Sequence, residues 1–228
     1  MVKQHRQALV VEGGGMRGAF SSGFLDAFLQ QQFNPFDLCV GVSSGSTNVA
    51  NYLAAQQGRT LHIYLDHSLR SEFIHSGRFL RGGDLLDLKW MWDIVEQEYP
   101  LDQAQLFANH AEFYIVLTHA ISGQATYIKA AKDNILDGLR ASSSIPVLTR
   151  QAVEIFGEPY FDGGVADADT VPKVGDVVMW YENYFEIDNV NDNQLEINLK
   201  KLSNLCGQKI LEKDPRIVTN VTKFFKHS

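Results

Sequence analysis

Ser43 is the residue in this sequence best placed to act as a nucleophile. It stands in the pentapeptide Gly41-Val42-Ser43-Ser44-Gly45, directly after the apolar residues 38–40. Gly41 and Gly45 permit a strand-to-helix turn too tight for larger side chains, and such a turn raises a serine hydroxyl above a sheet, within reach of an ester carbonyl. Glycine and serine are also common in ordinary connections. The pentapeptide alone therefore leaves open a loop that merely joins a strand to a helix.

A glycine run near the N-terminus could supply an oxyanion hole for such a serine. Gly13, Gly14, Gly15, Arg17 and Gly18 follow an apolar strand pattern and precede a helical one. Backbone N–H groups at the start of a helix can converge on a developing negative charge, and the helix dipole adds to their field. Arg17 could strengthen that field or simply anchor the turn.

The same glycines also fit the Gly-x-Gly-x-x-Gly fingerprint of dinucleotide-binding folds. That fold needs an acidic residue at the carboxyl end of the second strand to hold the ribose. Here the second strand ends at Gly41, and Asp37 lies at its beginning. The position of the acid disfavours a dinucleotide cofactor.

The base that would activate Ser43 is better sought among carboxylates than among histidines. An α/β-hydrolase triad places its histidine after the acid in the chain, and only His227, one residue from the end, follows the late acids. His119 ends a predicted strand and is better explained as a structural histidine. Asp162 ends a short apolar segment and precedes Gly163 and Gly164, so its carboxylate could accept the serine proton. An Asp-Gly pair also commonly closes a turn.

Apolar periodicity predicts an α/β fold with a parallel sheet to carry these residues. Strand patterns alternate with helical patterns and glycine turns, which is typical of parallel α/β sheets. The predicted strands are 8–11, 36–40 and 113–118, and the predicted helices are 19–32, 47–56 and 133–141. Residues 82–99, rich in Leu and Trp, fit either a helix packed into the core or a cap over an acyl pocket whose tryptophans touch lipid.

The character of the chain changes near residue 171. Residues 175–181 and 184–187 have strand patterns, and we expect them to form two antiparallel strands. We therefore divide the chain into a hydrolase domain, 1–170, and a small β-rich segment, 171–228.

Composition excludes some classes of function. The chain has 228 residues, 45% hydrophobic and 21% charged, which suits one sizeable globular domain. A formal charge of −7 disfavours nucleic acid as a partner. No apolar run approaches the length of a membrane span, and the N-terminal apolar run is too short for a signal-peptide core, so we expect a cytoplasmic location.

Four ordered motifs together resemble the patatin-like phospholipase family over about residues 7–168. They are 12–18 with the glycine run, 41–45 with Ser43, 141–146 (Ala-Ser-Ser-Ser-Ile-Pro) and 162–164 (Asp-Gly-Gly). The resemblance implies a three-layer α/β/α fold with a mainly parallel central sheet. It further implies a catalytic dyad of Ser43 and Asp162, with an oxyanion hole from Gly13, Gly14 and Gly15. The implied substrates are phospholipids, lysophospholipids and other acyl esters, and the implied chemistry uses no metal or cofactor. We also expect transient contact with a membrane surface.

The chain departs from that family just after Asp162. Family members usually continue with a proline-containing turn, a helix and another core strand, whereas this chain continues with 167–173 and a strand-rich tail. Residues 172–190 resemble a small module of tailed-phage neck proteins. This departure motivates a second hypothesis, in which the hydrolase scaffold is incomplete and non-catalytic and the C-terminal module binds a partner.

Overall fold

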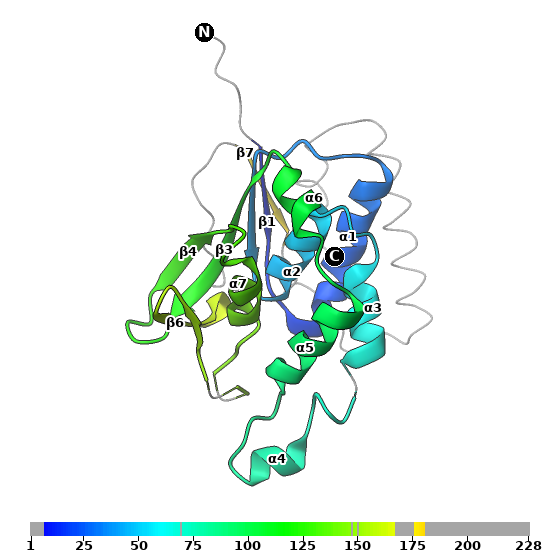
Figure 1. The fold of residues 1–228 in the computed structure, drawn as a ribbon. Helices are drawn as coiled ribbons and strands as arrows, with labels where there is room; N and C mark the ends of the chain where they lie inside the picture. Colours follow the sequence, from blue (N-terminus) through cyan, green and yellow to red (C-terminus); the bar gives the residue numbers. More distant parts are fainter. Residues whose placement is uncertain (1–6, 69, 147, 150, 167–175, 181–228) are drawn as a thin grey trace, which may run out of the picture.

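The computed structural model describes residues 7–68, 70–146, 148–149, 151–166 and 176–180 (Figure 1). Its strands are β1 (Gln7–Val11), β2 (Leu38–Val42), β3 (Glu112–His119), β4 (Ala125–Lys129), β5 (Val153–Ile155), β6 (Glu158–Asp162) and β7 (Asp176–Trp180). Its α-helices are α1 (Gly18–Gln30), α2 (Ser44–Leu53), α3 (Arg59–His67), α4 (Ser76–Leu80), α5 (Leu88–Glu98), α6 (Gln103–Ala108) and α7 (Ile135–Ser142). Short 3₁₀ helices cover Gly15–Arg17 and Gly163–Val165.

The strands form one mixed sheet that is parallel in its central part. Strands β7, β1, β2 and β3 are parallel neighbours, while β4, β5 and β6 join by antiparallel pairing. The predicted α/β fold with a mainly parallel central sheet is therefore confirmed.

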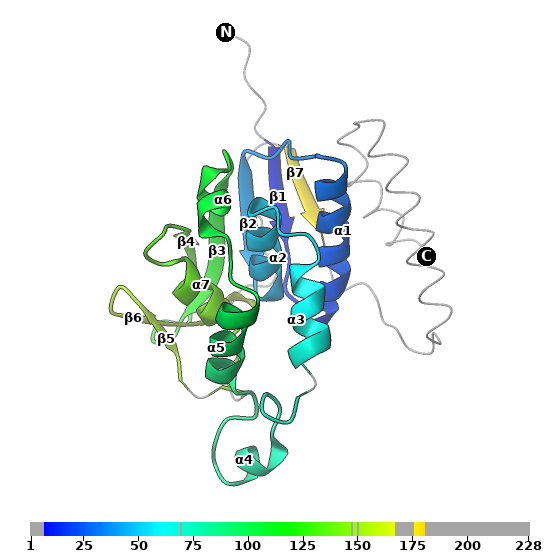
Figure 2. The same cartoon turned by 45° about the vertical axis from the view of Figure 1, so that its right-hand side comes forward.

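Helix α1 lies in the connection from β1 to β2, and α2 begins the connection from β2 to β3. Each connection moves one place across the sheet in the same direction. Right-handed crossovers that move in one direction put their helices on the same face. The two helices do pack side by side, with α3 beside them (Figure 2).

The central strands are buried on both faces. Leu9, Val11 and Cys39 belong to the large apolar core that also holds residues of α1, α2 and α5, whereas Ala8 and Val40 belong to a second buried cluster. Because side chains alternate between the two faces of a strand, the two clusters lie on opposite sides of the sheet. Burial on both faces is what the central layer of a three-layer α/β/α fold requires.

Helix α5 settles the two interpretations of the Trp-rich middle segment. Met91, Trp92 and Val95 are buried in the main core, and Trp90 packs against it. The expectation of a core helix is confirmed for α5. No helix in the described part of the chain is long and apolar enough to cross a bilayer.

Strand β7 makes a pairing that the sequence did not predict. Residues 176–180 do form a strand, but it pairs in parallel with β1, in register from Gln7 opposite Asp176 to Val11 opposite Trp180. The expected antiparallel partner, 184–187, lies outside the described residues. The period of a strand pattern reveals that a strand forms but not its partner, which is why the prediction missed this pairing. The division of the chain at residue 171 stays a prediction.

Candidate active site

Ser43 stands at a strained turn between β2 and α2. Its φ and ψ are 53° and −131°, a combination that residues other than glycine rarely adopt. The glycines around it are required by close approaches. A Cβ atom at Gly41 would lie 2.4 Å from the Ser46 Cα, and one at Gly45 would lie 2.3 Å from the Val11 carbonyl oxygen. Ser43 therefore has the local geometry of a nucleophile elbow.

The glycine loop lies directly against this elbow. A Cβ atom at Gly13 would lie 2.3 Å from the Ser43 Cβ, and one at Gly18, where α1 begins, would lie 2.8 Å from the Ser44 Oγ. The predicted glycine run and the predicted serine are thus neighbours in space.

Hydrogen bonds hold the glycine loop through its carbonyl groups. The Gly14 carbonyl accepts from the Arg17 amide at 3.2 Å and from the Arg17 Nε at 3.4 Å, and the Gly15 carbonyl accepts from the Tyr64 hydroxyl at 2.9 Å. None of these bonds uses the amides of Gly13, Gly14 or Gly15. The Arg17 side chain thus donates to a carbonyl of the turn, and a part for Arg17 in an oxyanion hole stays a prediction.

Strand register brings the second candidate residue to the same place. On β3, Val116 pairs with Val42 of β2, and the next residue, Leu117, pairs with Asp162 of β6. Both positions also pair with β4 on the other side. Strands β2 and β6 therefore follow one another along a single edge of β3 and meet end to end. Ser43 is the first residue beyond β2, so the turn that carries it adjoins Asp162.

Asp162 is a buried carboxylate with one unsatisfied oxygen. Only 3% of the residue is exposed. Its Oδ1 accepts from the Gly164 amide at 2.8 Å, and its backbone carbonyl accepts from the Thr118 hydroxyl at 2.8 Å. Its Oδ2 has no hydrogen-bond partner among the described residues. Gly163 is also required, since a Cβ there would lie 2.3 Å from the Val116 carbonyl oxygen.

Burial raises the pKa of Asp162 to about 6, while contacts with the Ser43 hydroxyl and the Gly164 amide oppose the rise. The Ser43 hydroxyl is close enough to lower the pKa of Asp162. It does not form a hydrogen bond of ordinary geometry with Asp162 Oδ2. Such contacts between catalytic groups are commonly long before substrate binds. A carboxylate with this pKa is a stronger base than an ordinary aspartate and is still ionised at neutral pH.

The histidines considered as bases lie in other surroundings. His119 contacts Glu158 through Nε2 at 3.0 Å and Ser122 through Nδ1 at 2.9 Å, as a structural histidine would. His227 lies outside the described residues. No group of three or more His, Cys, Asp or Glu side chains in the described part of the chain is arranged to hold a metal ion.

Some contributors to the site carried no clear signal of their role in the sequence. Tyr64 and Thr118 are remote in sequence from the groups they contact. Ser142 and Ser144 belong to the third motif of the family resemblance, which gave them no role, and both touch the candidate dyad.

Sequence similarity identifies the family of this chain. The family model of the patatin-like phospholipases matches residues 9–172. A curated relative, the uncharacterized protein YjjU of Escherichia coli K12, is 40% identical over 171 residues, covering 74% of this chain and 48% of the relative. The chain thus spans about half the length of that relative. A crystal structure of VipD from Legionella pneumophila aligns with 84% of this chain and 49% of its own, at 12% identity and a TM-score of 0.41. On the match of the family model, this chain belongs to the patatin-like phospholipase family.

Proposed function

We propose that this chain is a serine acyl-ester hydrolase of lipids in which Ser43 is the nucleophile and Asp162 the base. The observation that carries the proposal is the meeting of β2 and β6 on one edge of β3, which puts the strained serine beside a buried carboxylate. The glycine loop packed against Ser43 supports it, as does membership of a phospholipase family.

The reaction follows from the positions of these groups. The Ser43 hydroxyl attacks the ester carbonyl carbon and gives its proton to Asp162 Oδ2, which has no partner of its own among the described residues. Amides of Gly13, Gly14 and Gly15 stabilise the resulting oxyanion. Collapse of this intermediate releases the alcohol, which takes the proton from Asp162. Water then attacks the acyl-enzyme with Asp162 again as base, releasing the fatty acid and restoring Ser43.

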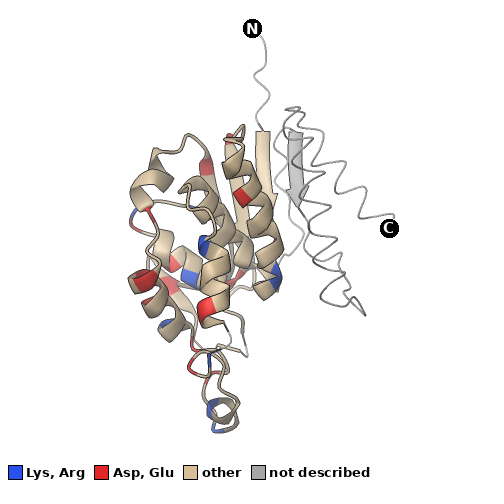
Figure 3. Ribbon diagram, turned by 90° about the vertical axis from the view of Figure 1, so that its right-hand side faces the viewer, with Lys and Arg blue, Asp and Glu red and all other residues tan. Residues whose placement is uncertain are grey.

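We further propose that contact with a lipid surface is made by α4 and its flanking loops. α4 projects beyond the carboxyl ends of the parallel strands, the end of the sheet at which Ser43 lies (Figures 1 and 2). Leu80 is 85% exposed and is followed by the exposed Arg81. Figure 3 shows basic residues at this tip. An apolar side chain next to a cation suits the interface of an anionic bilayer.

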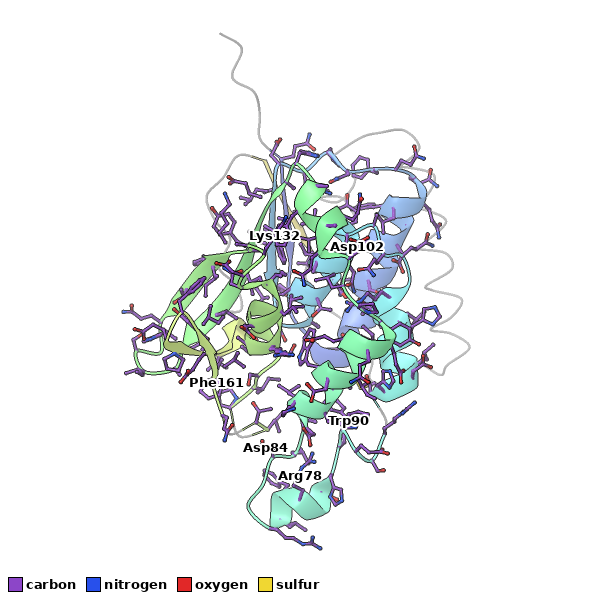
Figure 4. The ribbon with its side chains drawn as sticks, viewed as in Figure 1. Arg78, Asp84, Trp90, Asp102, Lys132 and Phe161 are labelled. Carbon is purple, nitrogen blue, oxygen red and sulfur yellow. The ribbon has the colours of Figure 1, made fainter. Side chains whose placement is uncertain are left out.

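The projecting loop has a fixed internal structure. Arg78 donates from Nη1 to the Asp87 carboxylate at 2.9 Å and from Nε to the Asp84 carbonyl at 2.9 Å. Figure 4 shows Arg78 and Asp84 together at the base of the tip. These bonds tie α4 to the loop that follows it.

The hypothesis of a non-catalytic scaffold rested on the break near residue 171. Pairing of β7 with β1 leaves that side of β1 closed, so the physical reason for expecting an incomplete sheet is weaker. The cytoplasmic location, the phage-like module and the independence of 171–228 remain predictions.

Labelling of the intact chain with a fluorophosphonate probe tests the proposed function without a choice of substrate. We expect an adduct on Ser43, identified by peptide mapping, that is absent in Ser43→Ala and Asp162→Asn. Asp133→Asn, which changes an exposed aspartate, is the matched control and should label normally. A folded wild-type chain that does not label at Ser43 would exclude the proposed activity.

A further inference from the structure

The turn that follows α7 touches the backbone of both candidate catalytic residues. We call Ser142, Ser143 and Ser144 the serine turn. Ser142 is the last residue of α7 and is fully buried, and Ser144 is almost so. The serine turn contributes neither the nucleophile nor the base, so the proposed chemistry leaves its contacts unexplained.

Ser142 holds the peptide group of Ser43. Its Oγ donates to the Ser43 carbonyl at 3.4 Å and lies 2.8 Å from the Oγ of Ser46, which is itself fully buried. Because Ser142 has a single hydroxyl hydrogen and donates to the Ser43 carbonyl, we infer that Ser46 is the donor in the second bond. The Ser43 carbonyl also accepts from the Ser46 amide at 2.9 Å. Two hydrogen-bond donors thus hold the carbonyl group of Ser43, the residue whose backbone is strained.

Ser144 holds the other half of the candidate dyad. Its backbone carbonyl accepts from the Asp162 amide at 2.8 Å. Its side chain points to different partners, the Thr149 hydroxyl at 3.0 Å and the Gln151 carbonyl at 3.3 Å. The bond to Asp162 therefore does not depend on the Ser144 side chain.

We propose that Ser142 is a positioning residue, and that the serine turn sets the distance between Ser43 and Asp162. Pairing on β3 brings the two residues to one edge, but the elbow stands beyond the last pair of β2 and needs its own restraint. The serine turn provides this restraint, because Ser142 binds Ser43 and Ser144, two residues further on, binds Asp162. This inference rests on the proposed function.

The central test compares two buried serines of the same turn. Ser142→Ala removes the hydroxyl that binds Ser43, whereas Ser144→Ala removes a hydroxyl and keeps the carbonyl that binds Asp162. We expect Ser142→Ala to lower kcat and the rate of fluorophosphonate labelling by about 10- to 100-fold with KM nearly unchanged, since small displacements of reacting groups cost factors of this size. Ser144→Ala should stay within about threefold of wild type. Equal losses in the two variants would overturn the proposal.

A double variant tests the order of the hydrogen bonds. Ser46→Ala should lower kcat less than Ser142→Ala, and the double variant should be no slower than Ser142→Ala alone, because residues acting through one bond are not additive. Multiplying losses would contradict the inferred direction from Ser46 through Ser142 to Ser43. Should Ser142→Ala fail to fold by circular dichroism, Ser142→Cys, of similar shape but a weak donor, replaces it with an expected loss in the same direction.

A titration separates this inference from the proposed function. The Asp162 carboxyl is followed by NMR in wild type, Ser142→Ala and Ser144→Ala. Because contact with the Ser43 hydroxyl lowers the pKa of Asp162, release of Ser43 should raise that pKa in Ser142→Ala only. If wild type fails to label, the proposed function is excluded while this titration still judges the positioning role. An unchanged pKa in Ser142→Ala would exclude that role.

Discussion

Gly13 lies so close to Ser43 that a Cβ atom on Gly13 would stand 2.3 Å from the Cβ of the serine. No side chain fits there unless the loop or the elbow moves. We expect Gly13→Ala to reduce ester turnover at least 100-fold, because it displaces both the proposed oxyanion donors and the proposed nucleophile. Hydrolysis of a soluble short-chain nitrophenyl ester measures the loss.

Gly23→Ala is the matched control for that substitution. Gly23 lies within α1, where a Cβ atom would meet nothing within 4 Å. Alanine there should stabilise the fold by about 0.5–1 kcal/mol and leave turnover unchanged. Near-normal turnover in Gly13→Ala would show that the glycine loop does not form part of the site.

The backbone of Ser43 stores strain that a glycine would release. With φ at 53° and ψ at −131°, Ser43→Gly should be more stable than Ser43→Ala by about 1–3 kcal/mol. Both variants should lack labelling. Urea unfolding measures the difference. Ala55, with φ 54°, is a comparison outside the site, and Ala55→Gly should gain stability and keep full activity. If Ser43→Gly is no more stable than Ser43→Ala, the backbone of Ser43 is not strained.

Activity should depend on the ionisation of Asp162. Burial raises the pKa of this group to about 6, and only its charged form could accept the proton of Ser43 in the proposed reaction. We expect kcat/KM to rise with pH through about 6 and to level off above it. A pH profile on the soluble ester gives the midpoint, and Asp133→Asn should reproduce it. A midpoint near 4, or a second rise near pH 7 that implicates a histidine, would argue against Asp162 as the base.

Stability should change with pH in the opposite sense. The pKa of Asp162 in the folded chain, about 6, exceeds its ordinary value of 3.8. Between these values the folded state binds more protons than the unfolded state, so the free energy of unfolding falls as pH rises. Two pKa units correspond to about 3 kcal/mol. Chemical denaturation at pH 4 and pH 7 measures the free energy of unfolding. Its fall between the two pH values should be smaller in Asp162→Asn than in wild type and unchanged in Asp133→Asn. Equal pH dependence in all three proteins would rule out the raised pKa.

Lipid binding should depend on the tip of α4. Leu80→Asp places a charge on the most exposed apolar side chain of that tip and should weaken sedimentation with phosphatidylglycerol vesicles by about tenfold, since it removes apolar contact and adds repulsion. Turnover of the soluble ester should not change. Ile121→Asp is the control, because Ile121 is 79% exposed but lies in the β3–β4 turn. Equal vesicle binding by wild type and Leu80→Asp would locate any lipid contact elsewhere.

Local signals predicted most of the elements that carry the site. The strands at 8–11 and 36–40 and the helices that follow them were expected from apolar periodicity, and the structure has β1, α1, β2 and α2 there. Family membership, too, was expected from four short motifs. Such signals work because turn glycines and apolar spacing act within a few residues.

Partners of strands were harder to predict. Residues 176–180 form a strand, as expected, but their pairing with β1, about 170 residues away in sequence, was not predicted. A strand pattern specifies which residues are extended and buried but leaves the hydrogen-bonding partner open. The third motif was likewise visible in the sequence, yet the bonds from Ser142 to Ser43 and from Ser144 to Asp162 depend on how α7 packs.

The sequence by itself determined the chemical types at the candidate site: a serine in a turn that only glycines permit, a glycine loop before a helix, and an acid before two glycines. Only the tertiary structure decided that these groups meet. Val42 and Asp162 pair with adjacent residues of β3, and that register depends on pairing between segments that are distant in sequence. The burial of Asp162, which raises its pKa, arises from the same packing. Desolvation depends on all the atoms that surround a group, and most of these come from segments distant in sequence.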